Sequence, residues 1–235
     1  MKLSVSTSAC ARGIAAGDLT QLEFLDHAAR TWACDGVVLD ARQFPRTDDE
    51  YLAQVKKMAA DLGLTIAAVS EDGFFGAGDD EMNARLHRAS ALGAPLLAST
   101  LMVETTRPWS EQLERLSEAA RLAKRYNVTL CVRNAVGTFA ATASDCKRVS
   151  KETDSAWLRF GLDPHAFDAT SDPEALAERT VLLWFPLEGE PDGERATFRG
   201  FVALDSADGN AGPSEIHDAM RRWRIARAKN ELNRT

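Results

Sequence analysis

The amino-acid sequence predicts an α/β fold, a single (β/α)8 barrel of parallel strands that spans residues 1–235. Short apolar runs recur along the chain, and a helical pattern separates almost every neighbouring pair. The 235 residues suit eight such units, and no change of composition marks a second domain. A doubly wound open sheet is the alternative, but no glycine-rich dinucleotide turn follows the first run and no Walker-type loop occurs.

Each of the eight apolar runs has the length and composition of a buried strand. They read "KLSVS", "GVVL", "TIAAV", "PLLAS", "TLCV", "RFGL", "VLLWF" and "GFVAL", at residues 2–6, 36–39, 65–69, 95–99, 129–132, 159–162, 181–185 and 200–204. The last three runs are only about 20 residues apart, which leaves room for an irregular helix on that side of the barrel.

Helix start signals lie between these runs. Thr20 with Glu23 and Thr47 with Glu50 fit the capping box, in which two side chains satisfy the first free N–H groups of a helix. Asp172, which is followed by a proline, fits an N-cap with proline at the first helical position. These signals predict helices that begin near each of the three sites.

The stop signals and the apolar stripes agree with the same alternation. Gly63 and Gly93 stand where a glycine can end a helix in the left-handed conformation. The segment 110–126 is predicted to be an amphipathic helix, and 214–232 a final helix. The apolar face of the first of these two helices consists of Leu113, Leu116, Ala120 and Ala123.

Composition and charge exclude several classes of protein. The formal net charge is −7, which argues against a nucleic-acid partner. No apolar run reaches the roughly 20 residues of a membrane span, and the N-terminus lacks a signal-peptide core, so we expect a cytoplasmic protein without a membrane partner. The four cysteines show no CxxC spacing, which favours reduced thiols. A homodimer is the base-rate expectation for assembly.

Polar side chains gather where the predicted strands end, the edge at which barrel enzymes of this kind carry their active sites. In chain order, the candidates are Asp40, Glu71, Arg133 and Asn134, Asp163 and His165, Trp184, and Asp205. Because the carboxyl ends of parallel strands meet at one rim, we expect these side chains to face a common cavity.

Arg133 is the most unusual of these residues, because it ends a strand whose other side chains suit a buried core. An unpaired guanidinium is costly to bury. Asp163, Asp205 or Asp40 could neutralise it at the rim, and so could an anionic ligand whose phosphate or carboxylate matches the guanidinium fork.

His165 is the one histidine that follows a predicted strand, whereas His27, His87 and His217 fall inside predicted helices. It lies two residues after Asp163, which is the arrangement of a proton-transfer pair or a metal-ligand pair. The alternative is a loop histidine that caps nearby backbone groups.

The phrases "KLSVST", "GVVLD", "LGLTIAAVS", "LGAPLL", "AKRYNVTLCVRN", "LRFGLDPHAF" and "GFVALD" together resemble the xylose isomerase-like TIM-barrel superfamily over nearly the whole chain. That superfamily includes sugar phosphate isomerases and epimerases and endonuclease IV. The resemblance implies a divalent metal held by carboxylates and histidine at the ends of strands five to eight, which polarises a sugar during proton transfer.

Several positions depart from that pattern. Arg133 stands where the resemblance implies a glutamate, and Trp184 lies in the region where it implies a histidine. Asp163 matches the implied aspartate, His165 comes one residue earlier than the usual histidine, and Asp205 could be the last acidic ligand. A cation that cannot deprotonate repels a divalent ion, so we expect no cofactor. If manganese, magnesium, zinc or cobalt does bind, Asp163 and Asp205 are its expected ligands.

Three functional hypotheses follow. The first is a sugar phosphate isomerase or epimerase-like enzyme that acts without metal on a sugar or a related small polyol derivative. Arg133 would stabilise the developing charge, while Asp163, His165 or Glu71 moves the proton.

In this hypothesis Asn134, Asp40, Trp184 and Asp205 would bind the sugar-like or anionic substrate. The second hypothesis is a non-catalytic small-molecule-binding barrel that has lost the metal site. The third, an endonuclease IV-like DNA-repair nuclease, is the least favoured, because such an enzyme needs several histidine ligands.

The segment 71–81, "EDGFFGAGDDE", contains three glycines and two phenylalanines that look exposed. Such a loop could be a lid over the site or a contact between subunits.

Overall fold

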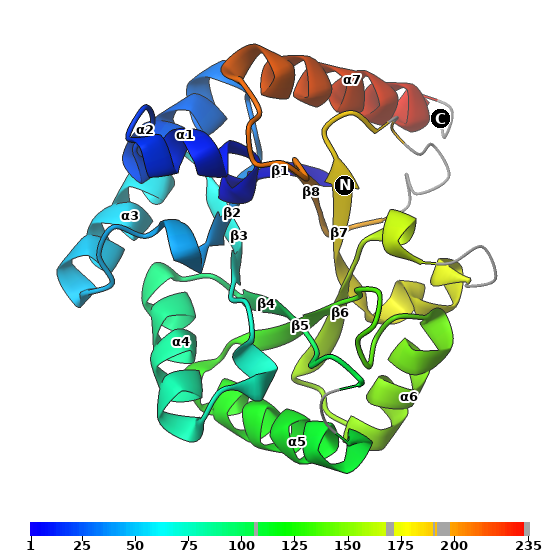
Figure 1. Cartoon of the computed structure of the whole chain (residues 1–235). Coiled ribbons are helices and arrows are strands. Elements are labelled where there is room, and N and C mark those ends of the chain that lie inside the picture. The colour runs from blue at the N-terminus through cyan, green and yellow to red at the C-terminus, as the bar shows by residue number, and fades with distance from the viewer. Residues whose placement is uncertain (106–107, 168–171, 190, 192–197, 233–235) are drawn as a thin grey trace. The chain divides into compact units, whose positions relative to one another are not determined.

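The eight predicted strands form a closed parallel barrel in the order β1 to β8 (Figure 1). The structure is a computed structural model that describes residues 1–105, 108–167, 172–189, 191 and 198–232. The strands are β1 (Lys2–Ser6), β2 (Gly36–Asp40), β3 (Thr65–Ser70), β4 (Leu96–Thr100), β5 (Thr129–Arg133), β6 (Leu158–Leu162), β7 (Thr180–Pro186) and β8 (Phe201–Asp205). The fold class that the alternating pattern predicts is therefore confirmed.

Helices separate the strands. The α-helices are α1 (Ala11–Ala16), α2 (Gln21–Asp26), α3 (Asp49–Asp61), α4 (Asp79–Leu92), α5 (Trp109–Tyr126), α6 (Ala143–Thr153) and α7 (Pro213–Leu232). Shorter helical segments are η1 (Thr7–Cys10), η2 (His27–Thr31), η3 (Ala41–Gln43), η4 (Phe74–Gly76), η5 (Pro164–Ala166) and η6 (Pro173–Arg179). The short connection between β6 and β7 contains the 3-10 helix η6, as the spacing of the last strands predicts. No helix in the described part of the chain is both long and apolar enough to cross a membrane.

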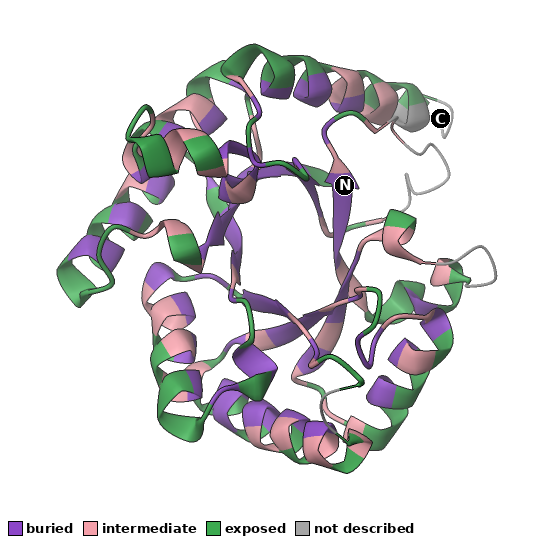
Figure 2. Cartoon of the chain, in the orientation of Figure 1, coloured by how far each residue is buried: buried purple, intermediate pink, exposed green. Residues whose placement is uncertain are grey.

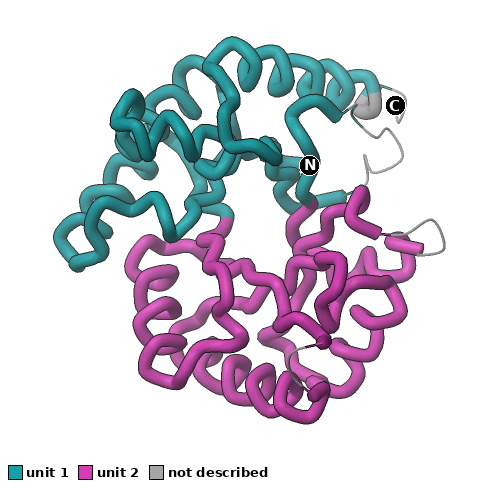
Figure 3. The backbone as a smooth tube through the Cα atoms, in the orientation of Figure 1, with its two compact units in different colours: residues 1–67, 184–235 teal, residues 68–183 magenta. Residues whose placement is uncertain are grey.

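The chain divides into two compact units (Figure 3). Unit 1 comprises residues 1–67 and 184–235, and unit 2 comprises residues 68–183, so the boundaries fall inside β3 and β7. The expectation of one domain over 1–235 stays a prediction.

In unit 1, β1 pairs in parallel with both β2 and β8, and aromatic side chains fill the layer between strands and helices. Phe185 of β7 packs against Trp223 of α7 with ring centroids 4.7 Å apart, and Phe24 packs edge-on against Trp32 at 5.5 Å. Burying rings of this size removes a large apolar area from water, at roughly 25 cal/mol per Å². The contact between Phe185 and Trp223 holds α7 against β7.

In unit 2, β4, β5 and β6 pair in parallel, and the helices present their apolar faces to the strands (Figure 2). Helix α5 buries Leu116, Ala120 and Ala123 as its stripe predicts, whereas Leu113 is only half-buried. The strand interior of Leu130, Cys131 and Val132 is completely buried. The polar residues that follow these strands are thus held on a rigid support.

The prediction that the two phenylalanines of segment 71–81 are exposed is wrong. Phe74 and Phe75 are both fully buried, and their rings meet edge-to-face at 5.2 Å. The backbone N–H of Phe74 also donates to the hydroxyl of Ser99 at 3.3 Å. Apolar burial of two rings explains why a glycine-rich segment folds inward here.

The helix caps agree with the sequence signals in all but one place. Thr20 and Glu23 form the predicted capping box, and Gly93 ends α4 with a φ of 72°. Thr47 is not the cap of α3, because the carboxylate of Asp48 accepts from the N–H of Tyr51 at 3.1 Å. A carboxylate at this position also meets the positive end of the helix dipole, which favours Asp48 over the threonine before it.

Candidate active site

Unit 2 contains a polar pocket at the carboxyl ends of its strands. Its volume is about 260 Å³. Four consecutive strand ends contribute polar side chains to its lining: Ser70 and Asp72, then Ser99 and Thr100, then Arg133 and Asn134, and finally Asp163. The pocket therefore lies where the functional site of a (β/α)8 barrel is expected.

Arg133 and Asp163 form an ion pair in this pocket. Nη2 of Arg133 lies 3.7 Å from Oδ2 of Asp163, and the two side chains are 30% and 23% exposed. A pair of this exposure contributes little to folding stability. The carboxylate of Asp163, which follows the next strand, compensates the positive charge of Arg133, and the guanidinium still reaches the pocket.

Asn134 holds the backbone on which Asp163 is mounted. Its Nδ2 donates to the carbonyl oxygen of Asp163 at 2.9 Å, and its Oδ1 accepts from the N–H of Asp163 at 2.7 Å. Asn134 is buried, and its amide uses one donor and one acceptor in these bonds. The ends of β5 and β6 are thereby tied together at the pocket.

Two hydroxyls of the pocket complement this pair, and sequence reasoning did not name them as site residues. Within the described part of the chain, the hydroxyls of Ser70 and Thr100 form no hydrogen bond with protein groups, and both residues line the pocket. Each ends its strand, β3 or β4, and this position is the signal that could have identified them. Such hydroxyls can bind the hydroxyl or carbonyl groups of a ligand.

Glu71 is directed to other partners. Its carboxylate accepts from Nη1 of Arg88 at 2.7 Å, and Nε of Arg85 lies 3.9 Å away, both on α4. Glu71 is buried and is absent from the lining of the pocket. Its contacts with α4 and its place outside the pocket count against Glu71 as the group that moves a proton.

His165 is placed by Asp163 in an unforeseen way. Oδ1 of Asp163 accepts from the backbone N–H of His165 at 3.0 Å, so Asp163 is the N-cap of η5 and His165 lies in its first turn. The imidazole is exposed, and His165 is absent from the lining of the pocket. The short spacing between the two residues thus corresponds to a capping contact.

The other three predicted residues belong to unit 1. The carboxylate of Asp40 is held by Nε and Nη2 of Arg42 at 3.0 and 2.5 Å. Oδ1 of Asp205 accepts from the hydroxyl of Ser8 at 2.7 Å and from the N–H of Ser206 at 2.9 Å. Trp184 is a core residue, 1% exposed, on the strand that carries Phe185.

The residues present do not fit the divalent metal that the fold family implies. Among the described residues, no three His, Cys, Asp or Glu side chains gather closely enough to hold a metal ion. Asp163 has a guanidinium beside it, and Oδ1 of Asp205 already accepts two hydrogen bonds. A cation next to one ligand and occupied lone pairs on another both weaken divalent-ion binding.

The cysteines do not offer a nucleophile. All four are free, as the sequence predicts. Burial raises the pKa of Cys131 and of Cys146 to about 12, and burial together with the nearby Asp205 raises that of Cys10 to about 11. Thiols with such pKa values stay protonated near neutral pH and react slowly.

The fold and the pocket define a (β/α)8 barrel with a small polar site at its strand ends. The family model of the xylose isomerase-like TIM barrel matches residues 27–186, so the chain belongs to this family. A search of curated protein sequences found no match.

Solved structures share the fold at low identity. A xylose isomerase-like TIM barrel/4-hydroxyphenylpyruvate dioxygenase fusion protein is 17% identical with a TM-score of 0.79, over 99% of this chain and 43% of the fusion protein. The chain therefore spans less than half of that protein. The probable 3-DHS dehydratase AsbF from Bacillus anthracis is 13% identical with a TM-score of 0.79, over 94% of this chain and 98% of its own.

A third solved structure with this fold is D-psicose 3-epimerase from Clostridium cellulolyticum H10, with D-tagatose. It is 15% identical with a TM-score of 0.75, over 97% of this chain and 99% of its own. At these identities the likeness concerns the fold alone.

Proposed function

We propose that this protein is an isomerase- or epimerase-like enzyme that moves a proton on a small sugar, or on a related anionic polyol derivative, without a divalent metal. The observation that carries the proposal is the pair of Arg133 and Asp163 in the polar pocket of unit 2. A sugar epimerase among the structural neighbours is consistent with this class of substrate.

The two charged groups supply complementary chemistry. The guanidinium of Arg133 would donate hydrogen bonds to a substrate carbonyl oxygen and stabilise the negative charge that develops when the adjacent C–H bond breaks. The carboxylate of Asp163 would accept the proton and return it to the neighbouring carbon, which isomerises the substrate; epimerisation would need a second acid that returns a proton to the opposite face of the same carbon. Asp163 is preferred to Glu71 and His165 because it lines the pocket.

The remaining pocket groups would orient the substrate. The free hydroxyls of Ser70 and Thr100 can bind substrate hydroxyls on the side of β3 and β4. Asn134 keeps Asp163 in place through the two backbone hydrogen bonds. The predicted contacts of Asp40, Trp184 and Asp205 with substrate remain predictions.

Exchange of solvent deuterium into candidate sugars and sugar acids, followed by NMR, tests the proposal. We expect exchange with the parent protein and its loss in Arg133→Leu, because the variant cannot stabilise the intermediate. Arg125→Leu, which removes an exposed guanidinium from α5, is the matched control and should exchange like the parent. Equal exchange in Arg133→Leu and the parent would show that Arg133 is not the electrophile.

A second candidate function is a small-molecule-binding barrel without catalysis. It is favoured by the ion pairs of Glu71 and Asp163, since both candidate carboxylate bases have a guanidinium beside them. A ligand would then raise the melting temperature in a saturable way and would be recovered unchanged. Deuterium incorporation into that ligand would rule this function out.

A further inference from the structure

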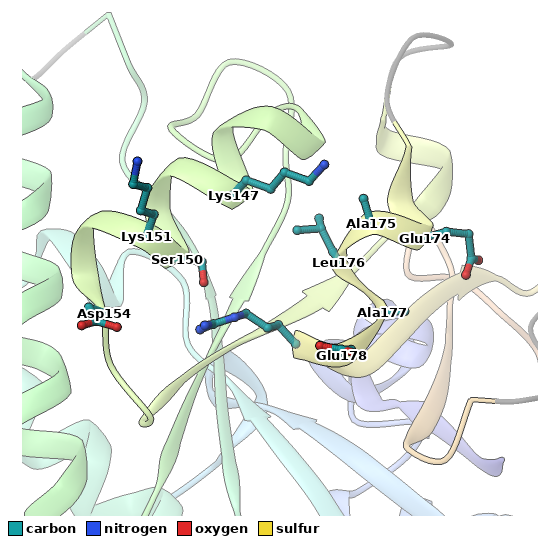
Figure 4. A pocket seen from close by; sticks show the side chains of 10 residues that line it. Lys147, Ser150, Lys151, Asp154, Glu174, Ala175, Leu176, Ala177 and Glu178 are labelled. Atoms are coloured by element: carbon teal, nitrogen blue, oxygen red, sulfur yellow. The ribbon is translucent and has the colours of Figure 1, made fainter.

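A second cavity lies in unit 2 on the flank of the barrel, between α6 and η6 (Figure 4). Its volume is about 670 Å³, and it shares no lining residue with the pocket at the strand ends. This groove has the size of a small-molecule site. It is lined by residues 174–179 of η6 and, on the α6 side, by Lys147, Ser150, Lys151 and Asp154.

Ser150 is the most informative residue of the groove. It is 8% exposed, and its hydroxyl makes no hydrogen bond with any described residue. Figure 4 shows this hydroxyl directed from α6 into the space beside η6. The oxygen itself is open to the groove, so it can donate a hydrogen bond to a ligand there or accept one from it.

The cations of the groove are also unpaired. Within the described part of the chain, Lys147, Lys151 and Arg179 form no ion pair, although three carboxylate side chains line the same groove. Some helix cations elsewhere do pair: Arg148 of the same helix pairs with Glu152 at 2.9 Å, and Lys57 pairs with Asp61 at 2.5 Å. The groove therefore keeps its donors available.

The balance of charge limits the ligand. Three cations face three carboxylates, namely Asp154, Glu174 and Glu178. The carboxylates disfavour a polyanion such as a nucleic acid, while they can accept hydrogen bonds from hydroxyl groups. The lysines, the serine hydroxyl and the guanidinium are donors that suit a single phosphate group.

We propose that the groove between α6 and η6 binds a small phosphate monoester, with its phosphate on Lys147, Ser150, Lys151 and Arg179 and its hydroxylated part toward the carboxylates. This site is separate from the proposed active site and does not rest on its chemistry. It lies on the two helical segments that follow β5 and β6, the strands before Asn134 and Asp163.

Isothermal titration calorimetry at low ionic strength tests the proposal, with glycerol phosphate and inorganic phosphate as probes and citrate as the carboxylate comparison. We expect saturable binding of glycerol phosphate that weakens as salt screens the lysines. Ser150→Ala, and separately the double variant Lys147→Gln/Lys151→Gln, should each weaken it by roughly tenfold or more, since each removes contacts to a charged group. Alanine also favours the helix, so Ser150→Ala should fold.

The matched control is Lys56→Gln/Lys124→Gln, which makes the same change of net charge at exposed, unpaired lysines of α3 and α5. It should bind like the parent, and so should Arg133→Leu, because Arg133 lies in the other pocket. Unchanged binding in both groove variants would overturn the proposal. Absence of phosphate binding, or binding of citrate alone, would also overturn it.

Discussion

Replacing Asn134 with alanine should destabilise the protein well beyond an ordinary loop substitution. The change removes two hydrogen bonds, from Nδ2 to the carbonyl oxygen of Asp163 at 2.9 Å and from the N–H of Asp163 to Oδ1 at 2.7 Å. Each is worth about 1 kcal/mol net, and leaving the two backbone groups of Asp163 without partners adds roughly 1 kcal/mol where water does not replace them. We therefore expect a loss of about 3 kcal/mol in the free energy of unfolding.

Urea unfolding followed by circular dichroism measures this loss, with the m value, the slope of the free energy of unfolding against urea concentration, the same in variant and parent. Asn83→Ala is the matched control, because Asn83 also makes two hydrogen bonds but at a more exposed place. Its Nδ2 donates to the carbonyl oxygen of Asp79 at 2.8 Å, and its Oδ1 accepts from the hydroxyl of Tyr126 at 3.2 Å. It should lose about 1 kcal/mol. If Asn134→Ala costs no more than this control, the reasoning that Asn134 clamps β5 to β6 is refuted.

Three further predictions concern other parts of the chain. Glu71→Gln should lower the free energy of unfolding, measured in urea, by about 3 kcal/mol, because it leaves the guanidinium groups of Arg88 and Arg85 without their buried carboxylate. The control Glu81→Gln, at an exposed carboxylate, should lower it by less than about 1 kcal/mol. Equal losses in the two variants would contradict this account. The hydrogen bonds from Arg46 and from the N–H of Tyr51 lower the pKa of Asp48 to about 2, so the stabilisation from this cap is present above the unfolded pKa of about 4 and is lost as pH falls through about 2. Asp48→Asn should flatten the acid limb of the unfolding curve, and an unchanged limb would speak against it. Finally, burial raises the pKa of Cys34 to about 12 and keeps Cys131 protonated. Alkylation of these thiols by iodoacetamide near pH 8 should therefore be slow until urea unfolds the chain. Rapid labelling of the native protein would disagree with the structure.

Local signals in the sequence were sufficient for the fold. Each apolar run became a strand within about one residue, because a buried parallel strand needs a continuous run of apolar side chains and the helices between them need a stripe. The cap at Thr20 and the glycine stop at Gly93 depend on atoms only a few residues apart, so the sequence contains the whole interaction. The error at Thr47 has the same scale, since two adjacent residues can both cap and the carboxylate of Asp48 does so.

The site was predicted less completely, because its contacts join residues that are distant in sequence. Arg133 and Asp163 were both identified from their positions at strand ends, and the pair at 3.7 Å is consistent with the charge compensation that a strand-ending arginine requires. His165 and Glu71 satisfied the same positional rule, yet η5 turns His165 outward and α4 supplies arginines to Glu71. Strand position identifies the edge at which a side chain begins, but neighbouring helices decide which way it points.

By itself, the sequence determined the eight-stranded parallel barrel, the edge that carries polar residues and the unusual arginine at the end of β5, because periodicity and residue type are local properties. Only the tertiary structure decided that Asn134 holds the backbone of Asp163, that Phe74 and Phe75 are buried, and that Ser150 faces an open groove beside Lys147 and Lys151. These features depend on which segments pack side by side and on how many donors find acceptors there. Burial and hydrogen bonding between distant residues are consequences of packing, which no short window of sequence contains.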